Sequence, residues 1–274
     1  MATALRPYQA VFRARFQLLL QYRAAALAGF GTQCWWGAIK VMVFAAFLRG
    51  PVASPMTLRQ AIDYVWLGQA LLTLLPWSAD AELARMVRSG DVAYERLRPL
   101  DTYTFWYARA VARRTATPLL RAIPMVVTTG LLFPLVGLGR WGLSAPASFE
   151  AAALFAASMI LVIALSSAFS TLLDVLVVAT LSERGVNTFV APLSIVLSGS
   201  LIPLPLLPEW LQPAMRYQPF AGLLDFPLRI YSGNITGWGA IAALGRQAVW
   251  TVVVITIGRL LMQRVMARLQ AQGG

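Results

Sequence analysis

The sequence of 274 residues contains no histidine and a single cysteine, Cys34. An intramembrane zinc protease needs histidine ligands, and a rhomboid-type protease needs a serine with a histidine base, so both classes of enzyme are excluded. A lone cysteine cannot form a disulfide framework, and without histidine a Cys/His metal site is excluded as well. We therefore expect no metal site in this chain.

Lysine is almost as scarce, because Lys40 is the only one beside 22 arginines. A P-loop places its lysine after a glycine-rich loop, whereas Lys40 follows Trp-Gly-Ala-Ile inside an apolar run. A diacid site would need paired carboxylates within the membrane, but only Asp174 lies well inside an apolar run, with Asp63 near the edge of another. We predict that the chain is not an enzyme, binds no cofactor of its own and does not hydrolyse ATP.

Apolar residues make up 58% of the sequence and charged residues only 12%, about half of the ~25% that soluble domains carry. The formal net charge of +12 could indicate a nucleic-acid partner. Here, however, the arginines lie between long apolar runs, a pattern that is typical of membrane topology. We expect no nucleic-acid partner, and the predicted fold class is an all-α polytopic membrane protein in a lipid bilayer.

Six apolar segments approach the ~20 residues that an α-helix needs to cross ~30 Å of hydrocarbon. Together they predict a single transmembrane domain over residues 1–274. The predicted spans are 24–48, 60–79, 117–138, 151–178, 186–203 and 243–263.

Residues 8–22 precede the first span and have the periodicity of an amphipathic helix. Apolar positions Tyr8, Val11 and Phe16 share one face, whereas Arg13 and Gln17 lie on another. Two interpretations remain open. The segment is an interfacial helix that lies along the membrane surface, or it extends the first span into the cytoplasm.

The distribution of arginine predicts the orientation. With the N-terminus in the cytoplasm, sixteen arginines fall on the inner side and six on the outer side. The positive-inside rule therefore predicts that both termini are cytoplasmic, which agrees with an even number of spans.

The cytoplasmic loop 80–116 is too long to serve only as a connection between two spans. Asp80 can cap a short helix that Gly90 ends, and Pro99 stops the stretch that follows. We predict that residues 80–100 dock on another protein. The alternative is a solvated basic loop that only enforces the topology.

The outer segment 203–237 contains six of the sixteen prolines and many apolar residues. It is too interrupted to span the membrane and too apolar for an exposed loop, and backbone at that depth must be paired or shielded by protein. We predict two short helices that dip back into the outer leaflet, with Pro208 near the start of one.

Several short motifs occur in a characteristic order along the chain. They are Val87-Arg-Ser-Gly-Asp91, Leu97-Arg-Pro99, Pro203-Leu-Pro-Leu-Leu-Pro-Glu-Trp210, Gln218-Pro-Phe220, Phe226-Pro227, Gln247-Ala-Val-Trp250 and Gly273-Gly274. In their order and spacing these motifs resemble those of type-2 ABC export permeases, and in particular the viologen-exporter-like group. The resemblance covers nearly the whole chain.

The resemblance implies six spans, a cytoplasmic coupling helix between spans two and three, and a re-entrant helix pair between spans five and six. It also implies two cytoplasmic P-loop ATPase subunits that bind ATP and Mg²⁺, and a second permease. A related paralogue is favoured for that permease, and an identical copy remains open. The residues that would contact the ATPase are Glu82, Arg85, Met86, Arg88, Gly90, Asp91 and Arg98.

Polar and aromatic side chains at helical spacing in spans one, two and five form a candidate substrate cavity, because the resemblance implies that these spans face the partner permease. The alternative is ordinary helix packing through small and hydrogen-bonded residues. The candidate residues are Gln33, Trp36, Trp66, Gln69, Thr73, Asn187, Ser194 and Ser198.

The two charges predicted within spans, Asp174 and Lys40, each need an explanation, because a charge in the middle of the bilayer costs ~2.5–3.5 kcal/mol. Asp174 is either a polar packing contact or a proton or cation site. Lys40 reaches the outer interface or pairs with Asp63, and structural pairing is the favoured role for both charges.

We therefore expect the permease subunit of an ATP-driven exporter in the bacterial cytoplasmic (inner) membrane. Its substrate would be an amphipathic or cationic compound, and a lipid, peptide or glycan is not excluded. The rival hypothesis is a self-contained secondary transporter with Asp174 and Lys40 as its coupling charges.

Overall fold

The computed structural model describes residues 2–48, 54–97 and 99–271, and every regular element in these ranges is helical. Three elements are short: α6 (Phe133–Leu135), α9 (Gln212–Tyr217) and α10 (Asp225–Tyr231). The longer helices are α1 (Ala2–Leu19), α2 (Arg23–Phe47), α3 (Leu58–Ala70), α4 (Ala81–Ser89), α5 (Thr102–Val126), α7 (Phe149–Thr180), α8 (Glu183–Leu197) and α11 (Gly237–Ala271).

Three helical stretches are long and apolar enough to cross a membrane, namely 102–135, 149–180 and 237–267. The first continues from α5 through a π-helical turn, η3 (Val127–Leu132), into α6. The other three predicted spans do not reach this standard. The α2 helix has 25 residues but is not among these three stretches, and the 13 residues of α3 and 15 of α8 give lengths of only about 20 and 22 Å.

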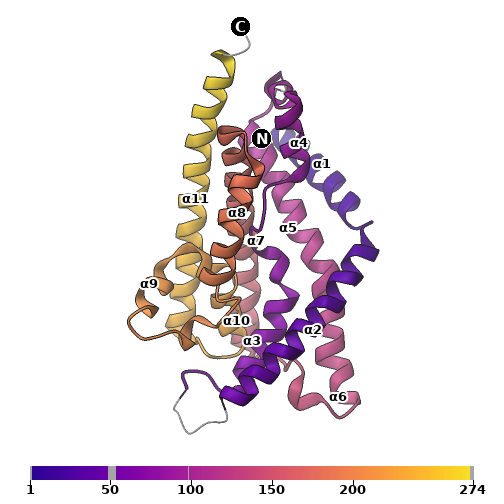
Figure 1. Cartoon of the computed structure of the whole chain (residues 1–274), viewed down its shortest axis with the longest axis vertical. Coiled ribbons are helices and arrows are strands. Elements are labelled where there is room, and N and C mark those ends of the chain that lie inside the picture. The colour runs from indigo at the N-terminus through magenta and orange to yellow at the C-terminus, as the bar shows by residue number, and fades with distance from the viewer. Residues whose placement is uncertain (1, 49–53, 98, 272–274) are drawn as a thin grey trace.

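The long helices form one bundle in which α11 packs along α7, α5 packs between α7 and α1, and α2 crosses α3 and α5. The start of α1, the C-terminal end of α11 and α4 all lie at one end of the bundle, and α6 lies at the opposite end (Figure 1). The face of α1 that contains Tyr8 and Val11 packs against the core, while Arg13 and Gln17 are exposed. The N-terminal residues therefore form a helix of their own with one packed and one exposed face, as the sequence predicts, and its position along the membrane surface stays a prediction.

The predicted continuous span 60–79 is wrong in its second half. The α-helix ends at Ala70, and a 3-10 turn, η1 (Leu72–Leu74), leads into extended chain at Leu75. Pro76 explains the break, because a proline disfavours the helical conformation of the residue before it, and Leu75 has a ψ of 139°. We call residues 71–80 the 71–80 segment.

Beyond Leu71 the backbone of the 71–80 segment makes only a few turn-type hydrogen bonds of its own, and side chains from three neighbouring helices pair several of its other backbone groups. Such pairing is required because unpaired backbone groups are costly away from water. Three side chains donate to its carbonyl groups: Arg114 Nη1 to Thr73 (2.6 Å) and Leu75 (2.9 Å), Ser166 Oγ to Leu74, and Ser194 Oγ to Pro76 (3.3 Å). Two side chains accept from its N–H groups: Asn187 Oδ1 from Ala79 (3.0 Å) and Asp174 Oδ1 from Asp80 (2.7 Å).

The region 203–237 contains the two short helices that its sequence predicts, and a turn at Pro208 precedes α9. Its α10 is buried against the core, where the carboxylate of Asp225 accepts hydrogen bonds from Tyr64 Oη (3.1 Å), the Leu204 N–H (3.2 Å) and Arg229 Nη1 (3.2 Å). One buried carboxylate therefore joins this region to α3.

Two further charged side chains within the predicted spans, Lys40 and Asp63, also have partners. Lys40 Nζ donates to the carbonyl of Ser200 (2.6 Å), so it does not form the predicted pair with Asp63. Asp63 instead accepts from Arg59 Nη2 (2.6 Å) and from the N–H and Oγ of Ser144.

A pair of substitutions tests whether Asp174 acts as a backbone acceptor. Asp174→Asn retains an acceptor oxygen for the Asp80 N–H, whereas Asp174→Leu leaves that buried N–H unpaired. We expect the leucine variant to lose ~1–3 kcal/mol of unfolding free energy and the asparagine variant clearly less. Denaturant unfolding in detergent measures both, and equal losses would contradict the assignment.

Candidate functional site

The helix α4 is bounded by the two residues that the sequence predicts. The Asp80 side chain accepts from the Glu82 N–H (2.9 Å) as an N-cap, and Gly90 ends the helix with a φ of +83°, a conformation that glycine adopts without strain. Pro99 and the 3-10 segment η2 (Asp91–Leu97) follow. The sequence therefore determines this short helix locally.

One face of α4 is fixed to the bundle. Leu83 and Ala84 are buried, and Glu82 forms ion pairs with Arg15 of α1 and Arg109 of α5 (3.3 Å to the latter). This position of Glu82 turns its carboxylate toward the protein and joins α4 to both helices.

The carboxylate of Asp80 lies 3.9 Å from the guanidinium groups of both Arg109 and Arg113. Burial alone would raise the pKa of Asp80, but the nearby charges of Arg113 and Arg109, with the capping hydrogen bond, bring that pKa below its ordinary value. Asp80 therefore stays ionised at neutral pH and holds the start of α4 against α5.

The opposite face of α4 is exposed. Arg85 projects from it without a hydrogen bond or ion pair to any residue in the described ranges, and Arg88 pairs with Glu183 of α8 (2.8 Å). Gly90 and Asp91 are also exposed, whereas Met86 is half-buried and lines a hollow beside α1. Arg98 lies outside the described residues.

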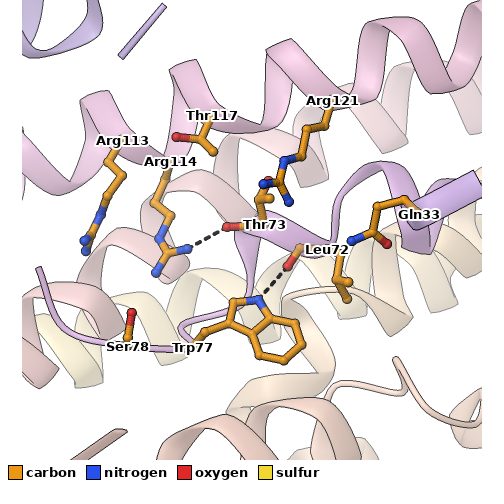
Figure 2. A pocket seen from close by; sticks show the side chains of 9 residues that line it. All are labelled: Gln33, Leu72, Thr73, Trp77, Ser78, Arg113, Arg114, Thr117 and Arg121. Carbon is orange, nitrogen blue, oxygen red and sulfur yellow. Dashed lines mark hydrogen bonds between the residues drawn. The ribbon is translucent and has the colours of Figure 1, made fainter. Parts of the chain in front are cut away.

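Beside the 71–80 segment lies a hollow of about 450 Å³. Three arginines of α5 project into it from one side, and Gln33 of α2 faces them (Figure 2). We call it the arginine hollow, and its lining residues are Gln33, Leu72, Thr73, Trp77, Ser78, Arg113, Arg114, Thr117 and Arg121.

The polar groups of the arginine hollow are only partly paired. Arg114 is held by its bonds to the 71–80 segment and by Ser170 Oγ (2.8 Å), and Trp77 Nε1 donates to the Leu72 carbonyl (3.0 Å). Several other buried polar atoms lack a hydrogen-bond partner within the described residues. These atoms are Gln33 Oε1, Thr73 Oγ1, Nε and Nη2 of Arg113, and Nε of Arg121.

The structure brings only some of the predicted cavity residues together. Gln33 and Thr73 line the arginine hollow, and Trp36, one helical turn from Gln33, is exposed. The other five are engaged elsewhere: Trp66 is buried and donates to the Trp141 carbonyl (2.7 Å), Gln69 and Ser198 are buried, and Asn187 and Ser194 bind the 71–80 segment.

Sequence reasoning assigned the α5 arginines to topology and missed their common surface. Arg113, Thr117 and Arg121 recur at intervals of four residues, and Arg114 lies seven before Arg121, so all four share one face of a helix. That periodicity was the available signal. Within the described residues, no three cysteine or carboxylate side chains gather as a metal site would require.

Comparison with known proteins gives one family. A sequence model of the family described as "ABC-2 family transporter protein" matches residues 35–273, which is most of the chain. The chain matches none of the curated proteins and none of the solved structures with which it was compared.

The role of Asp80 predicts graded effects of two substitutions. Asp80→Asn keeps the cap but removes the charge that faces Arg109 and Arg113. We expect the opening free energy of α4 to fall by ~1 kcal/mol, so that amide exchange in 81–89 accelerates about 5-fold. Asp80→Ala also removes the cap and should add another ~1 kcal/mol. Hydrogen–deuterium exchange of the full chain measures both effects. Equal exchange rates in the two variants would contradict the assignment of Asp80 as both helix cap and ion-pair partner.

The lowered pKa of Asp80 adds a pH dependence. The stabilisation of α4 by Asp80 should be fully present above the ordinary carboxyl pKa and should disappear as the pH falls through the lowered value. The Asp80→Asn variant is the control, because its exchange, corrected for intrinsic rates, should not change over that interval.

Proposed function

We propose that this chain, which belongs to the ABC-2 family of transporter proteins, is the membrane subunit of an ATP-driven exporter. It is a multi-pass membrane protein and the membrane component of an ABC transporter, without an ATPase domain. ABC-2 permeases pair with ATPase subunits in general. The proposal adds the direction of transport, the docking surface and the composition of the complex.

The observation that supports this proposal is the two-sided character of α4. One face is held by Leu83, Glu82 and Asp80, while the other presents the unpaired Arg85 beside the exposed Arg88–Glu183 ion pair. A helix that is fixed on one side and charged on the other can receive a push from a partner and pass it to the bundle. The exposed charges would recognise the surface of the ATPase.

The 71–80 segment connects α4 to the arginine hollow. Asp80, the cap of α4, is the last residue of the 71–80 segment, and Leu72, Thr73, Trp77 and Ser78 of this segment line the hollow. A displacement of α4 would therefore move one wall of the hollow directly. We propose that ATP-driven motion of the partner opens this wall for an amphipathic or lipid-like substrate.

In the proposed assembly two P-loop ATPases, which hold ATP and Mg²⁺, bind the inner surfaces of two permeases, and the second permease is a related paralogue. The chain crosses the bacterial cytoplasmic membrane six times, with both termini inside. The shared position of the start of α1, the end of α11 and α4 at one end of the bundle supports this topology (Figure 1).

The rival function, an ion-coupled secondary transporter, would use Asp174 and Lys40 as its coupling charges. Asp174 instead accepts from the Asp80 N–H, and Lys40 donates to the Ser200 carbonyl. Both groups serve local structure, which favours the externally powered transporter.

The docking surface is tested by reversing a charge on α4. Arg85→Glu changes an exposed side chain that has no partner among the described residues, so folding should be unaffected. Recovery of a P-loop ATPase with the tagged full chain should fall at least ~10-fold, because opposed like charges cost several kcal/mol. Quantitative mass spectrometry of the purified complex measures the ratio.

A second pair of variants separates docking from internal structure. Arg88→Glu should also reduce ATPase recovery, whereas Glu183→Gln breaks the same intramolecular ion pair without altering the exposed face of α4 and should leave recovery unchanged. Absence of any ATPase from the wild-type preparation, together with transport by the chain alone under an ion gradient, would overturn the proposal.

A further inference from the structure

We infer that the arginine hollow binds the anionic head group, a phosphate or carboxylate, of an amphiphilic substrate. The inference deepens the proposed function by naming the charge of the substrate and rests on that function for the direction of transport. It departs from the analogy that favoured a cationic compound, because three guanidinium groups repel a cation.

The lining of the hollow is positively charged. Arg113, Arg114 and Arg121 line it, and no carboxylate is among its lining residues. Two carboxylates act on these arginines from outside the hollow: Asp80, at 3.9 Å from Arg113, and Asp174, whose charge acts on Arg113 and Arg114. Guanidinium groups match carboxylate and phosphate oxygens through paired N–H donors, so an anion is the ligand that this arrangement recognises.

The three arginines have different roles. Arg114 is buried, and its hydrogen bonds to Thr73, Leu75 and Ser170 make it part of the scaffold. Arg121 has neither a hydrogen bond nor an ion pair within the described ranges, and its buried Nε lacks a partner. Arg113 has unpaired Nε and Nη2 atoms beside its distant contact with Asp80. Arg113 and Arg121 are therefore the donors available to a ligand.

The position of Arg121 depends on a glycine of α2. A Cβ atom at Gly29 would lie 2.6 Å from Arg121 Cζ, so the guanidinium rests directly against the backbone of α2. Gln33, one turn farther along α2, adds an amide whose Oε1 is unpaired. Two helices thus present polar groups to one space, which is the arrangement of a binding site rather than of a solvated surface.

The depth of the hollow fits a head group. The apolar run of α5 is predicted to begin near residue 117, which places Arg113 and Arg114 at the level of the inner-leaflet head groups and Arg121 about 11 Å deeper along the helix. An unpaired guanidinium at that depth is costly and calls for a counter-charge. An anion that enters from the inner leaflet supplies it.

Apolar groups beside the arginines provide contact for the rest of an amphiphile. Leu72 and Trp77 line the same hollow, and Trp36 is 54% exposed one turn from Gln33. A free inorganic anion would make no use of these side chains. The combination favours an anion attached to an apolar chain.

The test measures binding of two amphiphiles with the same tail and opposite charge. Dodecyl phosphate and dodecyltrimethylammonium are titrated separately into the purified full chain in an uncharged detergent, and thermophoresis reports the affinity. We expect dodecyl phosphate to bind at least ~10-fold more tightly. Equal affinities, or tighter binding of the ammonium compound, would overturn the inference.

Variants locate the site. Arg121→Gln should weaken binding of dodecyl phosphate at least ~10-fold, and Arg121→Lys, which keeps the charge, should restore part of it. The matched control is Arg140→Gln, which removes an exposed arginine outside the hollow and should have no effect. Thermal unfolding confirms that each variant is folded, and an unchanged affinity of Arg121→Gln would refute the assignment.

Two further measurements separate this inference from related possibilities. Inorganic phosphate that bound as tightly as dodecyl phosphate would overturn the assignment to an amphiphile. Recovery of the ATPase with Arg121→Gln should equal that of the wild type, because Arg121 is remote in sequence from α4 and contacts α2 instead. Loss of ATPase docking therefore tests the proposed function alone, and loss of anion binding tests this inference alone.

Discussion

The need to pair the backbone of the 71–80 segment organises this protein. Pro76 ends helical structure within a region of apolar sequence, and the exposed carbonyl and N–H groups that result must find partners away from water. Arg114, Asn187 and Asp174 supply some of them from three different helices. Positions of α5, α7 and α8 are thereby fixed relative to one short stretch of chain, and much of the polar content of the bundle is accounted for.

The same stretch lies between two surfaces with different tasks. At one end it continues into α4, which is anchored through Asp80 and Glu82 and displays Arg85. Along its length it forms a wall of the arginine hollow. The 71–80 segment is held along its length by hydrogen bonds, so motion imposed on α4 would be transmitted to the hollow and not absorbed by a flexible connection. In the proposed exporter this segment converts the work of the ATPase into a change of the substrate site.

The sequence predicted features that depend on local chemistry. The caps of α4, the buried face of α1 and the short helices α9 and α10 follow from neighbouring residues, and the structure contains all of them. Features that depend on distant contacts were not predictable. The stripe at Asn187 and Ser194 was interpreted as cavity lining, because only the tertiary structure reveals backbone partners in the 71–80 segment. The sequence supports only a topological role for the arginines of α5, through their positive charge. Their approach to Gln33 depends on the packing of α2 against α5, which the sequence does not reveal.

Support through the main chain has a consequence for how such a protein can diversify. The side chains of Arg114 and Ser194 grip carbonyl oxygens, which every amino acid possesses, and not the side chains of the residues that they hold. Substitutions at Leu72 or Ser78 would therefore alter the chemical character of this wall of the arginine hollow without removing the hydrogen bonds that support its backbone. The scaffold and the selectivity of the site can evolve separately, so related permeases could acquire new cargo while the transmission element stays intact.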